Sequence, residues 1–123
     1  MNKLSYKLCD IDSMPPDIVS QETLEKVFEI FAGGADGLAD LLKVLCNPIR
    51  LNTLRALEVR DLCVCVLVHM SGFQHSLLSY HLNLLKDNGL IESRREGNFQ
   101  IYGLTRRGRK IVKILELLEL EVE

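Results

Sequence analysis

The chain has 123 residues, of which 47% are hydrophobic and 26% are charged, and its formal net charge is −2. This composition is typical of one soluble domain that can bury a core without disulfide bonds. We expect no signal peptide and no membrane-spanning segment, since no apolar run approaches the ~20 residues needed to cross a bilayer. The sequence therefore predicts a cytoplasmic protein with no membrane partner, in which the four cysteines stay reduced.

The charged residues are distributed unevenly. Residues 1–40 carry three basic and eight acidic side chains, whereas residues 86–110 carry seven basic and three acidic ones. A local excess of positive charge is what a phosphate-contacting surface needs, whatever the net charge of the whole chain. This pattern indicates a nucleic-acid surface in the second half of the chain.

Residues 1–19 are predicted to form a flexible N-terminal arm, because Pro15-Pro16 prevents a continuous helix. Residues 20–123 are expected to form a single domain. Ser20 is a candidate cap for a helix over residues 21–31, which Gly33-Gly34 would end.

Two further helices are expected between residues 36 and 60. Asp36 begins the first, and Asn47-Pro48 begins the second, with proline at a tolerated first-turn position. Cys46, between them, is predicted to be a core residue. The apolar residues of these two helices follow helical spacing: Leu38, Leu41, Leu42 and Leu45 in the first, and Ile49, Leu51, Leu54 and Leu57 in the second.

The next segment has the pattern of a helix-turn-helix. Asp61 is predicted to cap a short helix that runs to about Met70, and Ser71-Gly72-Phe73 is a tight connection. A long helix then runs from about Gln74 to Asn88. Two helices joined by a short turn that contains glycine are typical of this motif.

A hairpin and a last helix complete the predicted fold. Residues 91–95 and 99–104 read as strands joined by Glu96-Gly97-Asn98. The fold class is therefore mainly α (α+β), a winged helix-turn-helix with flanking dimerisation helices that bury their apolar faces against a second copy. Thr105 is expected to cap the last helix, whose apolar side is Ile111, Ile114, Leu115, Leu118 and Val122.

The long helix predicts a DNA-reading surface. Its core face is Leu78, Leu82 and Leu85, and short or planar hydrogen-bonding side chains lie opposite, where they suit base edges in a major groove. Arg94 and Arg95 of the first wing strand are expected to reach a minor groove or phosphate. The predicted reading side chains of the helix are Gln74, His75, Ser76, Ser79, Tyr80 and Asn83.

Several segments share a joint spacing with a known family. They are Leu42-Lys43-Val44-Leu45-Cys46-Asn47-Pro48-Ile49-Arg50-Leu51, Ser79-Tyr80-His81-Leu82-Asn83-Leu84-Leu85-Lys86, Gly89-Leu90-Ile91, Arg94-Arg95-Glu96-Gly97 and Tyr102-Gly103-Leu104. Over roughly residues 38–105 this pattern resembles the ArsR–SmtB family of winged-helix repressors. The resemblance implies a homodimeric repressor that binds double-stranded operator DNA and is released by a metal or metalloid. It places Ser76, Ser79 and Tyr80 at the bases, and gives His81 either a buried hydrogen bond or a phosphate contact.

Asp61-Leu62-Cys63-Val64-Cys65 resembles the cysteine box of the family's thiolate sensors, although Val66 and Val68 stand where further ligands are found. Two thiolates are too few for a soft ion, which takes three or four ligands. Cys9 of the partner is the expected third metal ligand, by analogy with another branch of the family. Such an all-sulfur site favours As(III), Cd(II) or Pb(II), and Zn(II) also fits. Asp10, Asp12 and His69 are candidates for a fourth ligand. Of these, His69 is interpreted more readily as a surface residue than as a ligand.

Residues i and i+2 of a regular helix do not face each other, so Cys63 and Cys65 share an ion only near a pliable helix end. Such an end follows from the predicted cap at Asp61. A helix N-terminus also lowers thiol pKa, which favours thiolate. We expect ligation to deform this turn and to shift the helix-turn-helix relative to DNA.

Three other interpretations remain. The cysteines can act as a thiol redox switch, since accessible thiols oxidise readily, and the sequence is also compatible with haem. A winged helix used only as a protein-interaction module is a further alternative, which the polar helix face and the two wing arginines disfavour. An enzyme is not expected, because the chain has no nucleophile–base constellation and no phosphate-binding glycine loop.

Overall fold

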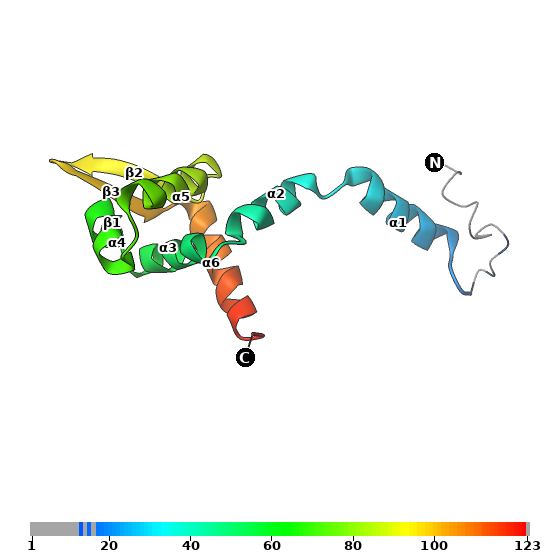
Figure 1. The fold of residues 1–123 in the computed structure, drawn as a ribbon. Helices are drawn as coiled ribbons and strands as arrows, with labels where there is room; N and C mark the ends of the chain where they lie inside the picture. Colours follow the sequence, from blue (N-terminus) through cyan, green and yellow to red (C-terminus); the bar gives the residue numbers. More distant parts are fainter. Residues whose placement is uncertain (1–12, 14, 16, 123) are drawn as a thin grey trace. The chain divides into compact units, whose positions relative to one another are not determined.

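The computed structural model describes residues 13, 15 and 17–122 (Figure 1). The chain divides into two units, Met1–Asp36 and Gly37–Glu123. Within the described part, no helix is long and apolar enough to cross a membrane. The elements are α1 (Gln21–Gly33), α2 (Asp36–Leu45), α3 (Pro48–Val59), β1 (Leu62–Cys63), α4 (Val64–Ser71), α5 (His75–Asp87), β2 (Ile91–Glu96), β3 (Phe99–Leu104) and α6 (Arg106–Glu119).

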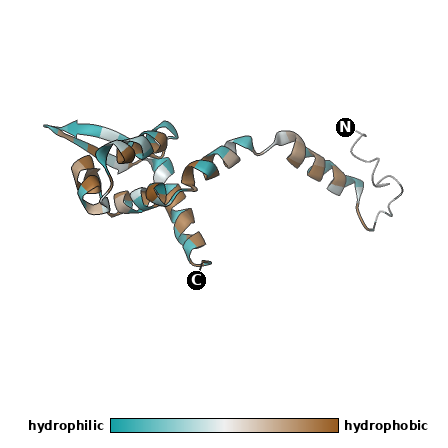
Figure 2. Cartoon of the chain, in the orientation of Figure 1, coloured by the Kyte–Doolittle hydropathy of each residue, from teal (hydrophilic) through white to brown (hydrophobic). Residues whose placement is uncertain are grey.

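Helix α1 belongs to the first unit. The hydroxyl of Ser20 accepts a hydrogen bond from the Thr23 N–H at 3.2 Å, and Gly34 ends the helix with a φ of 72°, so both predicted ends are confirmed. No residue of α1 is buried, and Phe31 is 81% exposed. Figure 2 shows how much of this helix is hydrophobic. Within the first unit, most apolar residues of this helix are therefore uncovered.

Helices α2 and α3 begin where the sequence predicts. The side chain of Asn47 accepts hydrogen bonds from the N–H groups of Ile49 and Arg50, at 2.9 and 3.2 Å, and so caps α3. Leu45 is the buried residue of α2. The prediction that Cys46 is a core residue was wrong: the last turn of α2 directs Leu45 inward, and Cys46, the next residue, is exposed.

The wing is part of a three-stranded antiparallel sheet in the order β1-β3-β2. The sequence predicts β2 and β3 closely, but not β1, which is two residues long and pairs with β3. Gly97 begins the two-residue turn between β2 and β3 with a φ of 61°, a conformation that favours glycine. Strand β1, which the sequence did not predict, therefore connects the segment before α4 to the wing.

Helix α6 packs part of its predicted apolar side, Ile111 and Leu115, against the core of this unit and leaves the rest uncovered. Thr105 caps it as expected, by accepting a hydrogen bond from the Gly108 N–H at 3.0 Å. Gly108 lies so close to the Leu90 carbonyl that a Cβ there would clash with it. This contact turns Val112 into the core and leaves Ile114 and Leu118 exposed. The predicted stripe also extended to Val122, but α6 ends at Glu119.

The core of the second unit lies between α3, α5, α6 and the sheet. Leu54 and Leu57 of α3 and the three predicted leucines of α5 are buried as expected, whereas Ile49 and Leu51 are half-buried. Gly72 ends α4 in the left-handed conformation, which makes the tight turn into α5. Six helices and a small β wing confirm the predicted mainly α winged helix-turn-helix. The fully buried side chains are Leu54, Leu57, Leu78, Leu82, Leu85, Leu90, Ile91 and Val112.

Candidate functional site

The outer side of α5 carries the predicted reading residues. Helical periodicity directs Leu78, Leu82 and Leu85 into the core, where His81 is also buried, so the opposite side of the helix faces away from the core. Of that set Ser79 is half-buried, and the exposed members are Gln74, His75, Ser76, Tyr80 and Asn83.

Two contacts order this outer side. The Ser79 hydroxyl lies 3.2 Å from Nδ1 of His75, one turn earlier. The ring of Tyr80, which is 59% exposed, packs edge-on against His81 with ring centroids 5.2 Å apart. Leu77 also lies on the surface of α5. The sequence prediction passed over Leu77 because an apolar residue on a helix is usually assigned to the core.

His81 has the geometry of a structural residue. Its side chain is 6% exposed, and its Nδ1 lies 3.2 Å from Nη1 of Arg50, whose Nε donates to the Val44 carbonyl at 2.6 Å. Burial, and then the charge of Arg50, hold the pKa of His81 below its ordinary value. Of the two roles expected for His81, these contacts correspond to the buried hydrogen bond, and little of the ring is open to a phosphate.

The two wing arginines differ in their surroundings. Both are exposed, but Arg94 donates from Nη1 to Asp61 at 2.6 Å and from Nε to Glu96 at 2.9 Å. These hydrogen bonds, first the one to Asp61, raise the pKa of Arg94 further above its ordinary value. Arg95, in contrast, has no ion pair among the described residues. The sequence prediction missed the link to Asp61, because 33 residues separate the two side chains in the chain.

Cys63 and Cys65 stand on either side of the boundary between β1 and α4. The prediction that Asp61 caps this helix was wrong: α4 begins at Val64, and Cys63 is its N-cap, with its sulfur accepting a hydrogen bond from the Cys65 N–H at 3.4 Å. Because Cys63 has extended backbone and Cys65 is helical, the rule that keeps i and i+2 apart on a regular helix does not apply. The two thiols are thus close enough to act together.

The electrostatics of this pair also differ from the expectation. A helix N-terminus was predicted to lower the thiol pKa, but the pKa of Cys65 is raised, mainly because its thiol hydrogen-bonds to the sulfur of Cys63. A soft cation that displaces the thiol protons would meet two neighbouring thiolates.

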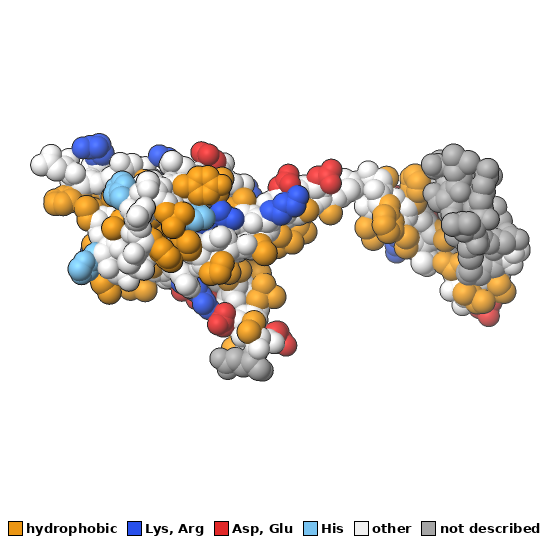
Figure 3. Space-filling view, viewed as in Figure 1, with side chains coloured by type: hydrophobic (Ala, Val, Ile, Leu, Met, Phe, Trp, Pro, Cys, Tyr) orange, Lys and Arg blue, Asp and Glu red, His pale blue; other side chains and the backbone are white. Residues whose placement is uncertain are grey.

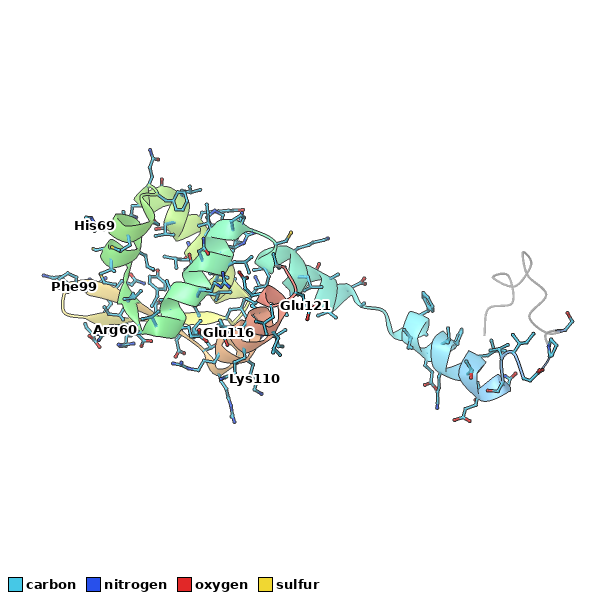
Figure 4. All side chains as sticks on the ribbon, turned by 90° about the horizontal axis from the view of Figure 1, so that it is seen from below. Arg60, His69, Phe99, Lys110, Glu116 and Glu121 are labelled. Atoms are coloured by element: carbon cyan, nitrogen blue, oxygen red, sulfur yellow. The ribbon has the colours of Figure 1, made fainter. Side chains whose placement is uncertain are left out.

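Further metal ligands are not gathered around the pair in the described residues, where no group of three or more His, Cys, Asp or Glu side chains could hold an ion. His69 lies in the last turn of α4, one helical turn after Cys65, and is exposed (Figure 4). The expected third ligand, Cys9, and the candidate ligands Asp10 and Asp12 lie outside the described residues. The two soft sulfurs fit part of a thiophilic site.

An apolar cavity of about 570 Å³ is lined mainly by residues of α3 and α4, and neither cysteine of the pair is part of its lining. Val66 and Met70 of α4 contribute to it, and both are exposed. Figure 3 shows hydrophobic side chains at the surface over this part of the molecule. Sequence periodicity did not indicate this cavity, because α4 is apolar on nearly every side.

Comparison with known proteins places this arrangement among bacterial regulators. The model of the family described as "Bacterial regulatory protein, arsR family" matches residues 47–93, which run from the cap of α3 into the wing. The arsenical resistance operon repressor of Staphylococcus xylosus is 40% identical over 67 residues, which cover 54% of this chain and 64% of that protein. The match thus spans less than two thirds of the length of that repressor.

Two other similarities extend further. The cadmium resistance transcriptional regulatory protein CadC of Listeria innocua is 29% identical over 120 residues, which cover 97% of this chain and 93% of CadC. Among solved structures, the homodimeric winged helix-turn-helix DNA-binding domain Mb0332 of Mycobacterium bovis superposes with a TM-score of 0.65. That domain is 28% identical, and the match covers 73% of this chain and 84% of that one.

Proposed function

Because the chain belongs to the ArsR family of bacterial regulatory proteins, we propose that it is a homodimeric repressor of a metal or metalloid resistance operon. It binds double-stranded operator DNA through α5 and the wing, and it releases that DNA when a thiophilic ion binds at Cys63 and Cys65. Family membership also confirms that the chain is a regulator and not an enzyme. The observation that carries the proposal is that a thiol pair and a polar reading helix belong to one helix-turn-helix.

DNA binding is supported by the side chains that α5 and the wing expose. Asn83 and Ser76 can hydrogen-bond to base edges, while Arg94 and Arg95 can contact phosphate or a minor groove. The N-cap Gln74 makes no side-chain hydrogen bond to the first turn of α5, so the N–H groups of that turn are open to a phosphate. We propose that these groups share one DNA-binding surface, together with His75, Ser79 and Tyr80.

A homodimer is supported by the apolar residues that the single chain leaves uncovered. In α1 they include Phe28 and Phe31, and in α6 they include Ile114, Leu117 and Leu118. A chain that exposes such stripes on its terminal helices gains stability by burying them against a second copy. The solved relative Mb0332 is described as homodimeric. We therefore propose that α1 and α6 form the dimer interface.

The effector is proposed from the chemistry of the pair. Adjacent thiolates favour As(III), Cd(II) or Pb(II), and a third thiolate from Cys9 of the partner would complete a trigonal site. Relatives of the chain are named for arsenical and cadmium resistance. We propose that the effector belongs to this group of ions and that the protein acts in the cytoplasm, where its thiols stay reduced.

The test is an operator titration with matched cysteine variants. A duplex is first selected from a random pool by the reduced protein, and its affinity is then measured with and without As(III), Cd(II), Pb(II) and Zn(II). Cys63→Ser and Cys65→Ser should bind the duplex as the parent does but lose the response to the ion. Cys46→Ser is the control, because Cys46 is also an exposed thiol but lies outside the pair. A full response in both variants of the pair would refute the thiolate site.

The closeness of the two cysteines, with Cys65 exposed, supports a second candidate, a redox switch, because an accessible thiol pair is also readily oxidised. Peroxide and the ions can be compared on the same duplex. If peroxide releases the DNA and dithiothreitol restores binding, while none of the four ions has an effect, the redox candidate replaces the metal site.

A further inference from the structure

On the outer face of the sheet, Cys63 of the cysteine pair and the wing residue Arg94 lie in one row. Ile101 of β3 pairs with Cys63 of β1 on one side and with Arg94 of β2 on the other. Directly paired residues of antiparallel strands point to the same face of the sheet. The side chains of Cys63, Ile101 and Arg94 therefore lie across one face, which is turned away from the core.

Asp61 closes the gap between β1 and β2 on this face. Its carboxylate lies over Gly103 of β3, where a Cβ would come within 2.5 Å of Oδ1, so the absence of a side chain at this position makes room for it. From there Asp61 accepts the hydrogen bond from Nη1 of Arg94 at 2.6 Å. An arginine in β2 is thus held by a residue that lies two positions before Cys63.

The ion pair orients Arg94 and adds little to stability. The Arg94 side chain is 51% exposed, and pairs this open to water contribute little to folding. Asp61 and Glu96 engage two of the five N–H donors of the guanidinium, which leaves the others free to contact a phosphate. What the two carboxylates provide is a fixed direction for a flexible side chain.

Ligation at Cys63 would disturb this arrangement. The Cys63 sulfur accepts the Cys65 N–H bond that caps α4, and its backbone belongs to β1. An ion bound by this sulfur, by Cys65 and by a third ligand would draw Cys63 toward itself. That movement would shift β1 and, with it, Asp61, which directly precedes the strand. Because β1 has only two residues, few backbone hydrogen bonds resist that movement.

We propose that Asp61 is a positioning residue that couples the cysteine pair to Arg94, so that effector binding withdraws Asp61 and the wing loses an oriented phosphate contact. This inference rests on the proposed function and adds a route from the ligand to the DNA that runs through the sheet. The inference gives Arg94 and Arg95 different roles: both contact DNA, but only Arg94 transmits the signal from the effector site.

The experiment compares the full-length protein with Asp61→Asn, Arg94→Ala and, as the matched control, Arg95→Ala. Operator affinity is measured with and without Cd(II), and binding of Cd(II) alone is followed by thiolate-to-metal absorption. In the parent, Cd(II) should weaken operator binding by roughly 5- to 150-fold, the usual range of allosteric coupling. Arg95→Ala should lower the metal-free affinity and keep that ratio. Asp61→Asn and Arg94→Ala should bind Cd(II) normally but retain only a small part of the ratio.

The outcomes separate the two proposals. If the parent ignores Cd(II) and the other ions, the proposed function fails and this inference fails with it. If the parent responds and Asp61→Asn keeps the whole ratio, only the role of Asp61 is overturned. Should Asp61→Asn not fold, the contrast between Arg94→Ala and Arg95→Ala decides, since both residues are exposed; equal ratios in those two variants contradict the coupling.

Discussion

The two helices of the helix-turn-helix, α4 and α5, follow each other in the chain but present different chemistry at the surface. Helix α5 buries four residues and exposes polar side chains, whereas α4 buries Leu67 and exposes Cys65, Val66 and Met70. Apart from the exposed Leu77 and Tyr80, the apolar residues of α5 lie in or against the core. The core covers the apolar residues of α4 only in part, so apolar and thiol groups remain exposed on the surface of this helix. We therefore expect α4 to bind a ligand or a partner, and α5 to contact DNA.

The largest expected effect tests whether the apolar side of α5 is core. Leu82 is 0% exposed, so Leu82→Ala should lower the free energy of unfolding by about 2–5 kcal/mol, through lost apolar contacts and the cavity left behind. Leu77→Ala is the control, because Leu77 is 41% exposed on the same helix, and its cost should stay below about 1 kcal/mol. Urea denaturation measures both. Equal losses would show that the two sides of α5 are not distinct.

The second prediction, with a smaller expected effect, tests whether α4 and α5 have separate roles. Asn83→Ala removes an exposed amide from α5 and should weaken operator binding by about 1–3 kcal/mol, the usual contribution of one good base contact. Its Cd(II) titration should match that of the parent. Cys65→Ser should show the reverse: unchanged DNA affinity and a lost thiolate absorption band. The division between α4 and α5 is contradicted if either variant loses both properties.

The smallest effect concerns His81, on the core side of α5. Its folded-state pKa lies below the ordinary 6.5, so the unfolded chain takes up a proton more readily than the folded one. Stability should therefore be unaffected by this group above about pH 6.5, and fall as the pH drops below that value until the folded imidazole is itself protonated. Urea denaturation between pH 7.5 and 5 measures the slope. His81→Gln should flatten it; an unchanged slope would assign the pH dependence to other groups.

The amino-acid sequence by itself predicts the helices and the leucine core face of α5. Leu78, Leu82 and Leu85 recur at helical spacing, and Ser20, Asn47 and Thr105 cap the helices that follow them. These signals are local: periodicity and capping act within a few residues of the chain. For the same reason the fold class, the tight turn at Gly72 and the wing hairpin could be predicted without coordinates.

The surroundings of the cysteine pair were decided by the tertiary structure. Strand β1 is too short to show an alternating pattern, and it exists because it pairs with β3. That pairing makes Cys63, and not Asp61, the cap of α4, and it brings Asp61 onto Gly103 and within reach of Arg94. Contacts between residues far apart in the chain depend on strand register and on close approach, neither of which leaves a periodic signal in the sequence.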